Sequence, residues 1–327
     1  MPIVSVLATG GTIASRAGAG GATAQDGGDD LVARLDLPSG VGLRVRDVVR
    51  VGGFRMTLDR VHEVARAVTA ELRDDAAAGV VITHGTDTIE ETAFFLDLFH
   101  DDPRPVVVTG AQRAADAPDT DGPRNLSDAV VTAATPAARG LGVLIGFGGQ
   151  LFPARGTRKT HTVAADTFAN PAGGPLGWVR GGTVEVVTAP RRGAALPLDA
   201  FDPAGVRVDV VACYPDADDT ALRACAGAGA RGVVLEATGA GNANPAICAA
   251  VRELTAAGVV VVTSTRVAAG PVVAIYGDGG GVDLLAAGAV PSGLLRPSQA
   301  RILLAALLGL HRDADVVRRA FLEHAYG

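Results

Sequence analysis

Residues 3–14 are IVSVLATGGTIA, and residues 80–92 are VVITHGTDTIEET. Each stretch begins with an apolar run that is typical of a buried parallel strand, and each ends in a turn rich in glycine and threonine. In doubly wound sheets, ligands bind just beyond the carboxyl ends of such strands. The two turns are therefore expected to share one pocket.

The alternation of apolar strands and amphipathic helices continues outward from these two stretches. Further strands are expected at 45–51, 105–109, 142–147, 207–212, 232–236 and 259–264, and helices at 57–78, 87–99, 123–134, 221–228, 245–257 and 297–310. Parallel strands that alternate with helices form a sheet covered on both faces. We therefore predict an α/β protein with a doubly wound, mainly parallel sheet in the larger N-terminal domain and a smaller α/β C-terminal domain.

The length of 327 residues fits two domains of ordinary size. A segment rich in Pro, Ala and Arg interrupts the periodic pattern near its middle. We place the N-terminal domain with the threonine turns at 1–190, the linker at 191–205 and the C-terminal domain at 206–327. The glycine- and alanine-rich stretch 18–28 has no apolar period, so we expect a mobile loop there that acts as a lid or as exposed linker.

The composition indicates a globular protein in a reducing compartment. Apolar residues make up 48% and charged residues 20% of the chain, and the formal net charge is −6. This balance argues against a nucleic-acid partner. No apolar run reaches membrane-spanning length, and the N-terminus lacks the pattern of a secretory signal. The three cysteines have no metal-ligand spacing, so we predict a cytoplasmic location, no membrane association and no metal or organic cofactor.

Lys159 is the only lysine in the chain, whereas arginine is used at every other strongly basic position. Arginine keeps its charge in any ordinary site, but a buried lysine can lose a proton and act as a base. The single lysine therefore suggests a chemical role for that amine. A solvated surface lysine is the alternative interpretation.

The two turns supply the other candidate catalytic groups. Thr12 carries a hydroxyl that is nucleophilic only when a neighbouring group draws off its proton, and Gly11 before it lets a substrate approach the backbone. Thr86 and Asp87 are candidates for binding the lysine and a substrate ammonium, although both also suit the start of a helix. His84 is either a base or a packed residue at the end of a strand.

These segments together resemble the bacterial-type L-asparaginase/glutaminase family over nearly the whole chain. The resemblance covers Thr9 to Ala14, His84 to Thr92, Asp121-Gly122-Pro123 with Asn125-Leu126, Thr157 to Thr162, Gly239 to Asn244 and Pro297 to Arg301. It implies two α/β domains, assembly as a homodimer or homotetramer, and hydrolysis of L-asparagine to L-aspartate and ammonia through a threonyl acyl-enzyme. Glutaminase activity, action on D-asparagine or another amide, and a non-catalytic amino-acid-binding role stay open.

The resemblance also assigns roles by position. Thr12 corresponds to the nucleophile. Thr86, Asp87 and Lys159 correspond to a second triad, in which Asp87 also binds the substrate's α-amino group. Asn244 corresponds to an asparagine that a neighbouring subunit contributes. We further expect Gly11 and Gly85 to contact the substrate, and backbone amides of the two turns to hold the oxyanion.

The chain departs from the family pattern at three places. Relatives usually carry a lid tyrosine about a dozen residues after the nucleophile, but this chain has no tyrosine before Tyr214. Many carry Ser-Gln at a substrate-binding position where this chain has Gly53 and Phe54, so we expect the Gly53 amide or Arg55 to bind the α-carboxylate. A glutamate expected from the neighbouring subunit is replaced near Gly277. Tyr276 and Asp278 flank this position, and we hypothesise that Tyr276 supplies the missing phenol.

Overall fold

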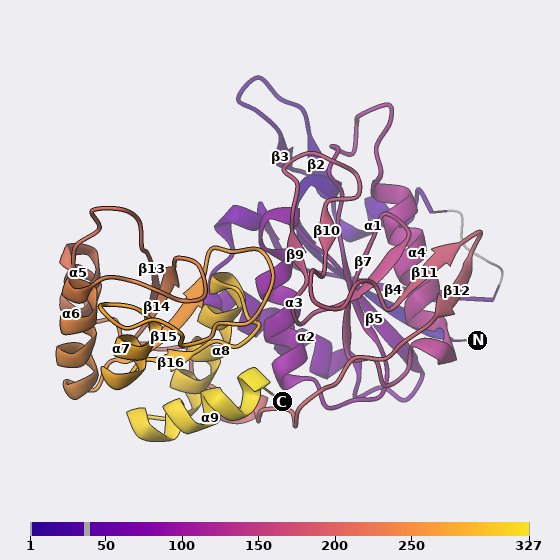
Figure 1. The fold of residues 1–327 in the computed structure, drawn as a ribbon. Helices are drawn as coiled ribbons and strands as arrows, with labels where there is room; N and C mark the ends of the chain where they lie inside the picture. The colour runs from indigo at the N-terminus through magenta and orange to yellow at the C-terminus, as the bar shows by residue number, and fades with distance from the viewer. Residues whose placement is uncertain (1, 36–39, 327) are drawn as a thin grey trace. The chain divides into compact units, whose positions relative to one another are not determined.

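The computed structural model describes residues 2–35 and 40–326. The chain folds into two compact units, Met1–Leu198 and Asp199–Gly327 (Figure 1). Within the described residues, no helix has both the length and the apolar character that crossing a membrane requires.

The first unit is built on an eight-stranded sheet whose order is β12-β11-β8-β7-β6-β5-β1-β4. Five neighbouring strands are parallel: β1 (Ile3–Gly10), β4 (Gly42–Val51), β5 (Ala77–Thr83), β6 (Val106–Thr109) and β7 (Val143–Phe147). Three shorter strands extend the sheet in antiparallel pairing: β8 (Gln150–Pro153), β11 (Gly177–Arg180) and β12 (Thr183–Val186). The predicted mainly parallel sheet is confirmed, and the antiparallel extension was not predicted.

Strand β1 lies between β4 and β5, and the order of strands reverses there. The chain passes from β1 to β4 on one side and then returns to β5 on the other. The loops that leave β1 and β5 therefore diverge at the carboxyl edge, which is where doubly wound sheets bind ligands. Ala8 of β1 pairs with Thr83 of β5, so the two threonine turns start at the same level of the sheet.

Helices cover both faces of this sheet. Helices α1 (Gly28–Val32) and α4 (Gly122–Ala134) pack on one face, where Leu31 and Leu126 join one apolar cluster. Helix α2 (Leu58–Glu71) contacts the sheet and α3 (Ile89–Phe99), and Ser5 of β1 donates to Glu71. The unit also contains the short 3-10 helices η1 (Thr12–Ala14), η2 (Gly53–Arg55), η3 (Thr86–Thr88) and η4 (Pro136–Ala138).

The prediction that the helix after Thr57 runs to about Ala78 is wrong at its C-terminal end. Thr57 caps α2 as expected and accepts a hydrogen bond from the backbone N–H of Arg60, but the helix ends at Glu71. The carboxylate of Asp74 accepts the backbone N–H of Ala76 instead (2.9 Å). Such local side-chain bonds compete with helix, and they turn the chain into β5.

Two small hairpins stand at one end of the first unit (Figure 1). Strands β2 (Ser15–Arg16) and β3 (Thr23–Ala24) form the first, and β9 (Arg158–Lys159) and β10 (Phe168–Ala169) form the second. The first hairpin lies partly in the stretch 18–28, which was predicted to be a mobile loop. Buried Asp26 anchors its base through ion pairs with Arg16 (2.6 Å) and Arg34 (2.7 Å).

The beginning of the predicted linker is bound to the first unit. Arg192 forms an ion pair with Asp97 (3.0 Å) and donates to the carbonyl of His100 (2.7 Å). The backbone N–H of Leu196 donates to Leu98 O (2.7 Å). The short helix η5 (Leu198–Ala200) follows in the chain.

The second unit is a four-stranded parallel sheet in the order β13-β14-β15-β16. Its strands are β13 (Val208–Ala212), β14 (Gly232–Ala237), β15 (Val260–Thr265) and β16 (Val290–Pro291). Its helices are α5 (Thr220–Gly227), α6 (Pro245–Ala256), α7 (Gly281–Ala286), α8 (Pro297–Leu310) and α9 (Ala314–Tyr326). The smaller α/β unit is as predicted, while β16, α7 and α9 were not expected.

Candidate active site

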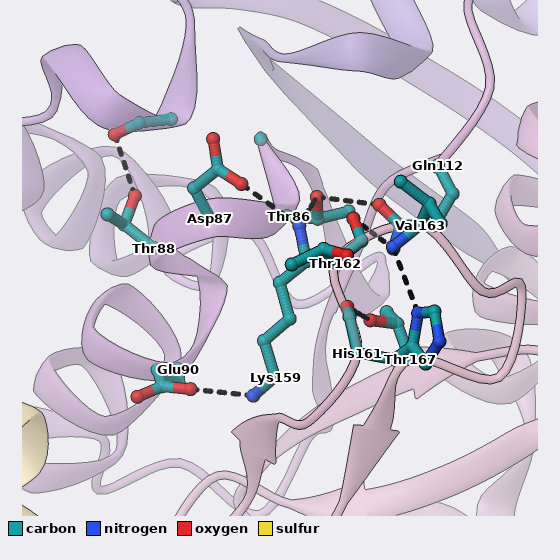
Figure 2. A network of polar contacts seen from close by, with 12 residues as sticks. Thr86, Asp87, Thr88, Glu90, Gln112, Lys159, His161, Thr162, Val163 and Thr167 are labelled. Carbon is teal, nitrogen blue, oxygen red and sulfur yellow. Dashed lines mark hydrogen bonds and ion pairs between the residues drawn. The ribbon is translucent and has the colours of Figure 1, made fainter.

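Lys159 lies close to both predicted partners at the start of α3. Its Nζ atom is 2.9 Å from Thr86 Oγ1 and 2.9 Å from Asp87 Oδ1. Figure 2 shows the lysine side chain extending from β9 toward these two residues. The sheet and the hairpin thus bring together groups that are more than 70 positions apart in the sequence.

Lys159 and Asp87 form an ion pair whose two side chains differ in exposure, 17% for the lysine and 56% for the aspartate. A paired ammonium donates all of its hydrogen bonds and accepts none. In this arrangement the lysine therefore donates to the Thr86 hydroxyl. The predicted role as a base requires the ammonium first to release a proton.

Two further residues complete this network, and neither was predicted to belong to the site. Glu90 Oε2 accepts the backbone N–H of Lys159 (2.7 Å), which ties β9 to the first turn of α3. Gln112 Oε1 accepts the Thr86 hydroxyl (3.1 Å). Glu90 was interpreted only as a charge that suits a helix N-terminus. Gln112 was not considered, although it follows β6 at the same edge of the sheet.

Glycines allow three loops to pack against each other beside these residues. Gly11 has a φ of +81°, and a Cβ atom there would lie 2.4 Å from the Gly85 nitrogen. A Cβ atom on Gly85 would lie 2.4 Å from the Gly53 nitrogen. The Gly53 carbonyl also accepts the hydroxyl of Thr88 (2.8 Å). Side chains at these three positions would force the loops apart.

Thr12 begins η1 directly after Gly11 and is half-buried. Because Gly11 packs against Gly85, each of the two candidate threonines follows a glycine of the same backbone contact. The Gly11 N–H, however, donates to the carbonyl of Val51 (2.9 Å). The Gly11 N–H is therefore engaged within the fold, and the contact of Gly11 with a substrate stays a prediction.

His84 is a packed residue in this structure. Its side chain is fully buried, with Nδ1 2.8 Å from the Gly85 carbonyl and Nε2 3.0 Å from the Thr92 hydroxyl. Burial lowers its pKa to about 4, against a weaker opposing effect of the Gly85 carbonyl. Of its two interpretations, the packed one fits: the neutral imidazole holds the turn between β5 and η3.

A cavity of about 320 Å³ opens next to the lysine. Its lining consists of Asp87, Lys159, Thr160, His161 and Thr162. An ammonium, a carboxylate and hydroxyls around a small space suit a zwitterionic ligand of amino-acid size.

The remaining predicted binding residues lie outside this network. The Phe54 side chain is 77% exposed. In the second unit, Asn244 caps α6 by accepting the Ile247 N–H (3.0 Å), and its side-chain amide donates to the Ala217 carbonyl (2.7 Å). Tyr276 is 59% exposed, and Asp278 has a φ of +53°. The substrate-binding role of Phe54 and the roles of Asn244, Tyr276 and Asp278 in a neighbouring subunit's site stay predictions.

Comparison with known proteins gives a consistent result for both units. Residues 3–192 match the family model "Asparaginase, N-terminal", and residues 207–321 match "Glutaminase/Asparaginase C-terminal domain". An L-asparaginase of Bacillus licheniformis is 34% identical, over 95% of this chain and 96% of that protein. A glutaminase-asparaginase of Pseudomonas aeruginosa is 33% identical, over 98% of this chain and 90% of that protein.

A solved structure also matches the whole chain. The crystal structure of a probable cytoplasmic L-asparaginase from Campylobacter jejuni has a TM-score of 0.87 and 30% sequence identity. The match covers 98% of this chain and 99% of that chain.

Proposed function

Because the chain belongs to the bacterial-type asparaginase/glutaminase family, we propose that it hydrolyses L-asparagine to L-aspartate and ammonia. The observation that carries this proposal is the contact of Lys159 Nζ with both Thr86 and Asp87 at 2.9 Å. The only lysine of the chain contacts a buried threonine and a half-exposed aspartate at the edge of a cavity, and this arrangement suits catalysis.

In the first step the Thr12 hydroxyl attacks the side-chain amide carbon of the substrate. The proton of Thr12 passes to the leaving nitrogen, ammonia departs, and an ester joins Thr12 to the aspartyl group. Backbone N–H groups of the two turns, other than that of Gly11, stabilise the oxyanion. One such donor contributes on the order of 3 kcal/mol to the lowering of the barrier.

In the second step a water molecule attacks the ester and releases aspartate and the free Thr12 hydroxyl. The Thr86 oxygen orients this water, and Lys159 holds Thr86 in place. Lys159, having released one proton to solvent, takes the proton of the attacking water and passes it to the Thr12 oxygen as that oxygen leaves the ester. The part of Asp87 that faces solvent binds the substrate's α-amino group. The contacts of Lys159 with Thr86 and Asp87 and the positions of the family motifs support these roles.

Ammonia release from a panel of amides tests the proposal. L-asparagine, L-glutamine and their D-forms are each supplied to the purified protein, and the steady-state rate is measured. We expect L-asparagine to have the highest kcat/KM. The similarity to a glutaminase-asparaginase makes L-glutamine the second candidate substrate. Thermal stabilisation by asparagine without any ammonia would instead indicate an amino-acid-binding protein.

We further propose that the protein is a cytoplasmic homo-oligomer, either a dimer or a tetramer. The name of the Campylobacter jejuni protein supports the location. Light scattering on the purified protein measures the oligomer, and cell fractionation measures the location. A monomer, or a periplasmic fraction, would contradict the corresponding part.

A further inference from the structure

The hydrogen bonds around Thr86 run in one direction. Gln112 Nε2 donates to the Ala164 carbonyl (3.1 Å) and to the Thr162 carbonyl (3.4 Å). Carbonyl oxygens only accept, so these two bonds orient the amide and turn its Oε1 atom toward Thr86. An amide oxygen cannot donate, so the hydroxyl of Thr86 donates to Gln112.

The hydrogen bond between Thr86 and Lys159 also has a fixed direction. The Lys159 ammonium donates to Thr86 Oγ1 at 2.9 Å. The donation therefore runs from Lys159 to Thr86 and on to Gln112. Figure 2 draws both contacts as dashed lines. A hydroxyl has one proton and two lone pairs. The Thr86 proton is donated to Gln112 and one lone pair of Thr86 Oγ1 accepts from Lys159, so the second lone pair is left for a substrate or a water molecule.

Gln112 is itself held firmly in place. Its backbone N–H donates to both oxygens of the Asp121 carboxylate (3.1 and 3.0 Å). The same carboxylate accepts the side-chain amide of buried Asn125 (3.1 Å), which also donates to the Gly110 carbonyl (3.0 Å). The loop that carries Gln112 is thus fixed between β6 and α4, and rotation of its side chain would break three contacts.

We propose that Gln112 is a positioning residue for the reaction, because it fixes the direction of the Thr86 proton. When the Thr86 hydroxyl donates to Gln112, its oxygen accepts a hydrogen bond from the attacking water. The reacting lone pair of that water then points away from Thr86. Without an acceptor at Gln112 the hydroxyl rotates, and part of the time it donates to the water that it should orient. This inference rests on the proposed hydrolysis and deepens it.

A purely structural role is the rival explanation, because Gln112 also ties down the loop after β9. That loop has other supports: His161 Nδ1 accepts the backbone N–H groups of Val163 (3.1 Å) and Ala164 (2.9 Å). Two variants separate the roles. Gln112→Met removes the acceptor and both donors. Gln112→Glu keeps an acceptor for Thr86, but it loses the two bonds to the loop and turns a carboxylate oxygen toward the carbonyls of Thr162 and Ala164.

The test measures kcat, KM and melting temperature for wild type, Gln112→Met and Gln112→Glu. The matched control is Gln150→Met in β8, which makes the same chemical change elsewhere in the first unit. We expect Gln112→Met to lower kcat about tenfold or more, with KM changed by less than about threefold. Gln112→Glu should retain clearly more of the turnover than Gln112→Met, and Gln150→Met should match wild type.

Two results would overturn the inference while leaving the proposed function intact. One is a Gln112→Met enzyme with wild-type kcat, and the other is a Gln112→Glu enzyme that is no better than Gln112→Met. If Gln112→Met does not fold, a Gln112→Glu enzyme within about tenfold of wild-type kcat supports the acceptor role, and a larger loss contradicts it. A folded wild type that releases no ammonia from any amide refutes the function itself and this inference with it.

Discussion

Gly11→Ala is the sharpest single test of how the site is assembled. The native φ of +81° is one that L side chains rarely adopt, and ψ is −175°. An alanine there carries a backbone strain of about 1–3 kcal/mol. Its Cβ atom would also lie 2.4 Å from the Gly85 nitrogen and 2.6 Å from the Gly85 Cα atom. Both obstacles are backbone atoms, so no side chain can simply turn away.

The size of the effect follows from these distances. An ordinary contact needs at least 3.4 Å, so the Thr12 turn and the Thr86 turn must separate by about 1 Å. A misplacement of that size between catalytic groups can lower activity about 100-fold. We therefore expect kcat/KM for asparagine to fall by about two orders of magnitude, with a loss of about 2–3 kcal/mol in the free energy of unfolding.

Steady-state ammonia release and urea denaturation measure the two effects. Gly193→Ala is the matched control, because a Cβ atom at Gly193 meets no heavy atom within 4 Å and its φ lies outside the left-handed region. The control should match wild type in both assays. A folded Gly11→Ala enzyme with kcat/KM near that of wild type would show that the contact of the two turns does not set the catalytic geometry.

Other predictions concern single side chains. Thr12→Ala and Thr86→Val should each lower kcat by orders of magnitude in the ammonia assay. Lys159→Arg should lose nearly as much turnover as Lys159→Met, because arginine cannot give up its proton; a normal arginine variant would refute the base role. His84 is buried with a pKa of about 4, so between pH 6.5 and about 4 the unfolded chain binds the extra proton and stability falls as the pH falls. Urea denaturation should show a loss of about 2 kcal/mol from pH 7 to pH 5 that His84→Asn removes. Tyr276→Phe should lower kcat if its phenol reaches a neighbouring site, and unchanged turnover would dispose of that hypothesis.

The sequence was sufficient to predict the central sheet because parallel strands are long, apolar and bounded by turns. It also predicted that the turns after β1 and β5 meet, since carboxyl ends of parallel strands share one edge. The strands of the β9–β10 hairpin escaped prediction because each has only two residues. Two residues cannot establish an alternating pattern. Lys159 was singled out by its uniqueness and not by any local structural signal.

The details of the site depend on contacts that a single segment does not encode. Glu90 lies within the quoted stretch 80–92, yet the partner of its carboxylate is the backbone N–H of Lys159, 69 positions away. The hydrogen bond from the Gly11 N–H to the Val51 carbonyl depends on the bulge between β1 and β4. Neither contact alters the composition or the apolar period of the segment around it, so neither can be predicted from the sequence of that segment.

Gln112 shows why such contacts nevertheless decide the chemistry. The residues next to Gln112 in the sequence do not decide whether its side-chain amide turns its oxygen or its nitrogen toward Thr86. The choice is made by the carbonyls of Thr162 and Ala164, which are 50 and 52 positions away. With the nitrogen facing inward, Thr86 would have two donors against it and its proton would turn to the reacting centre. Strand β9 therefore supplies the lysine, and the loop after it sets, through Gln112, the direction of the hydroxyl that this lysine contacts.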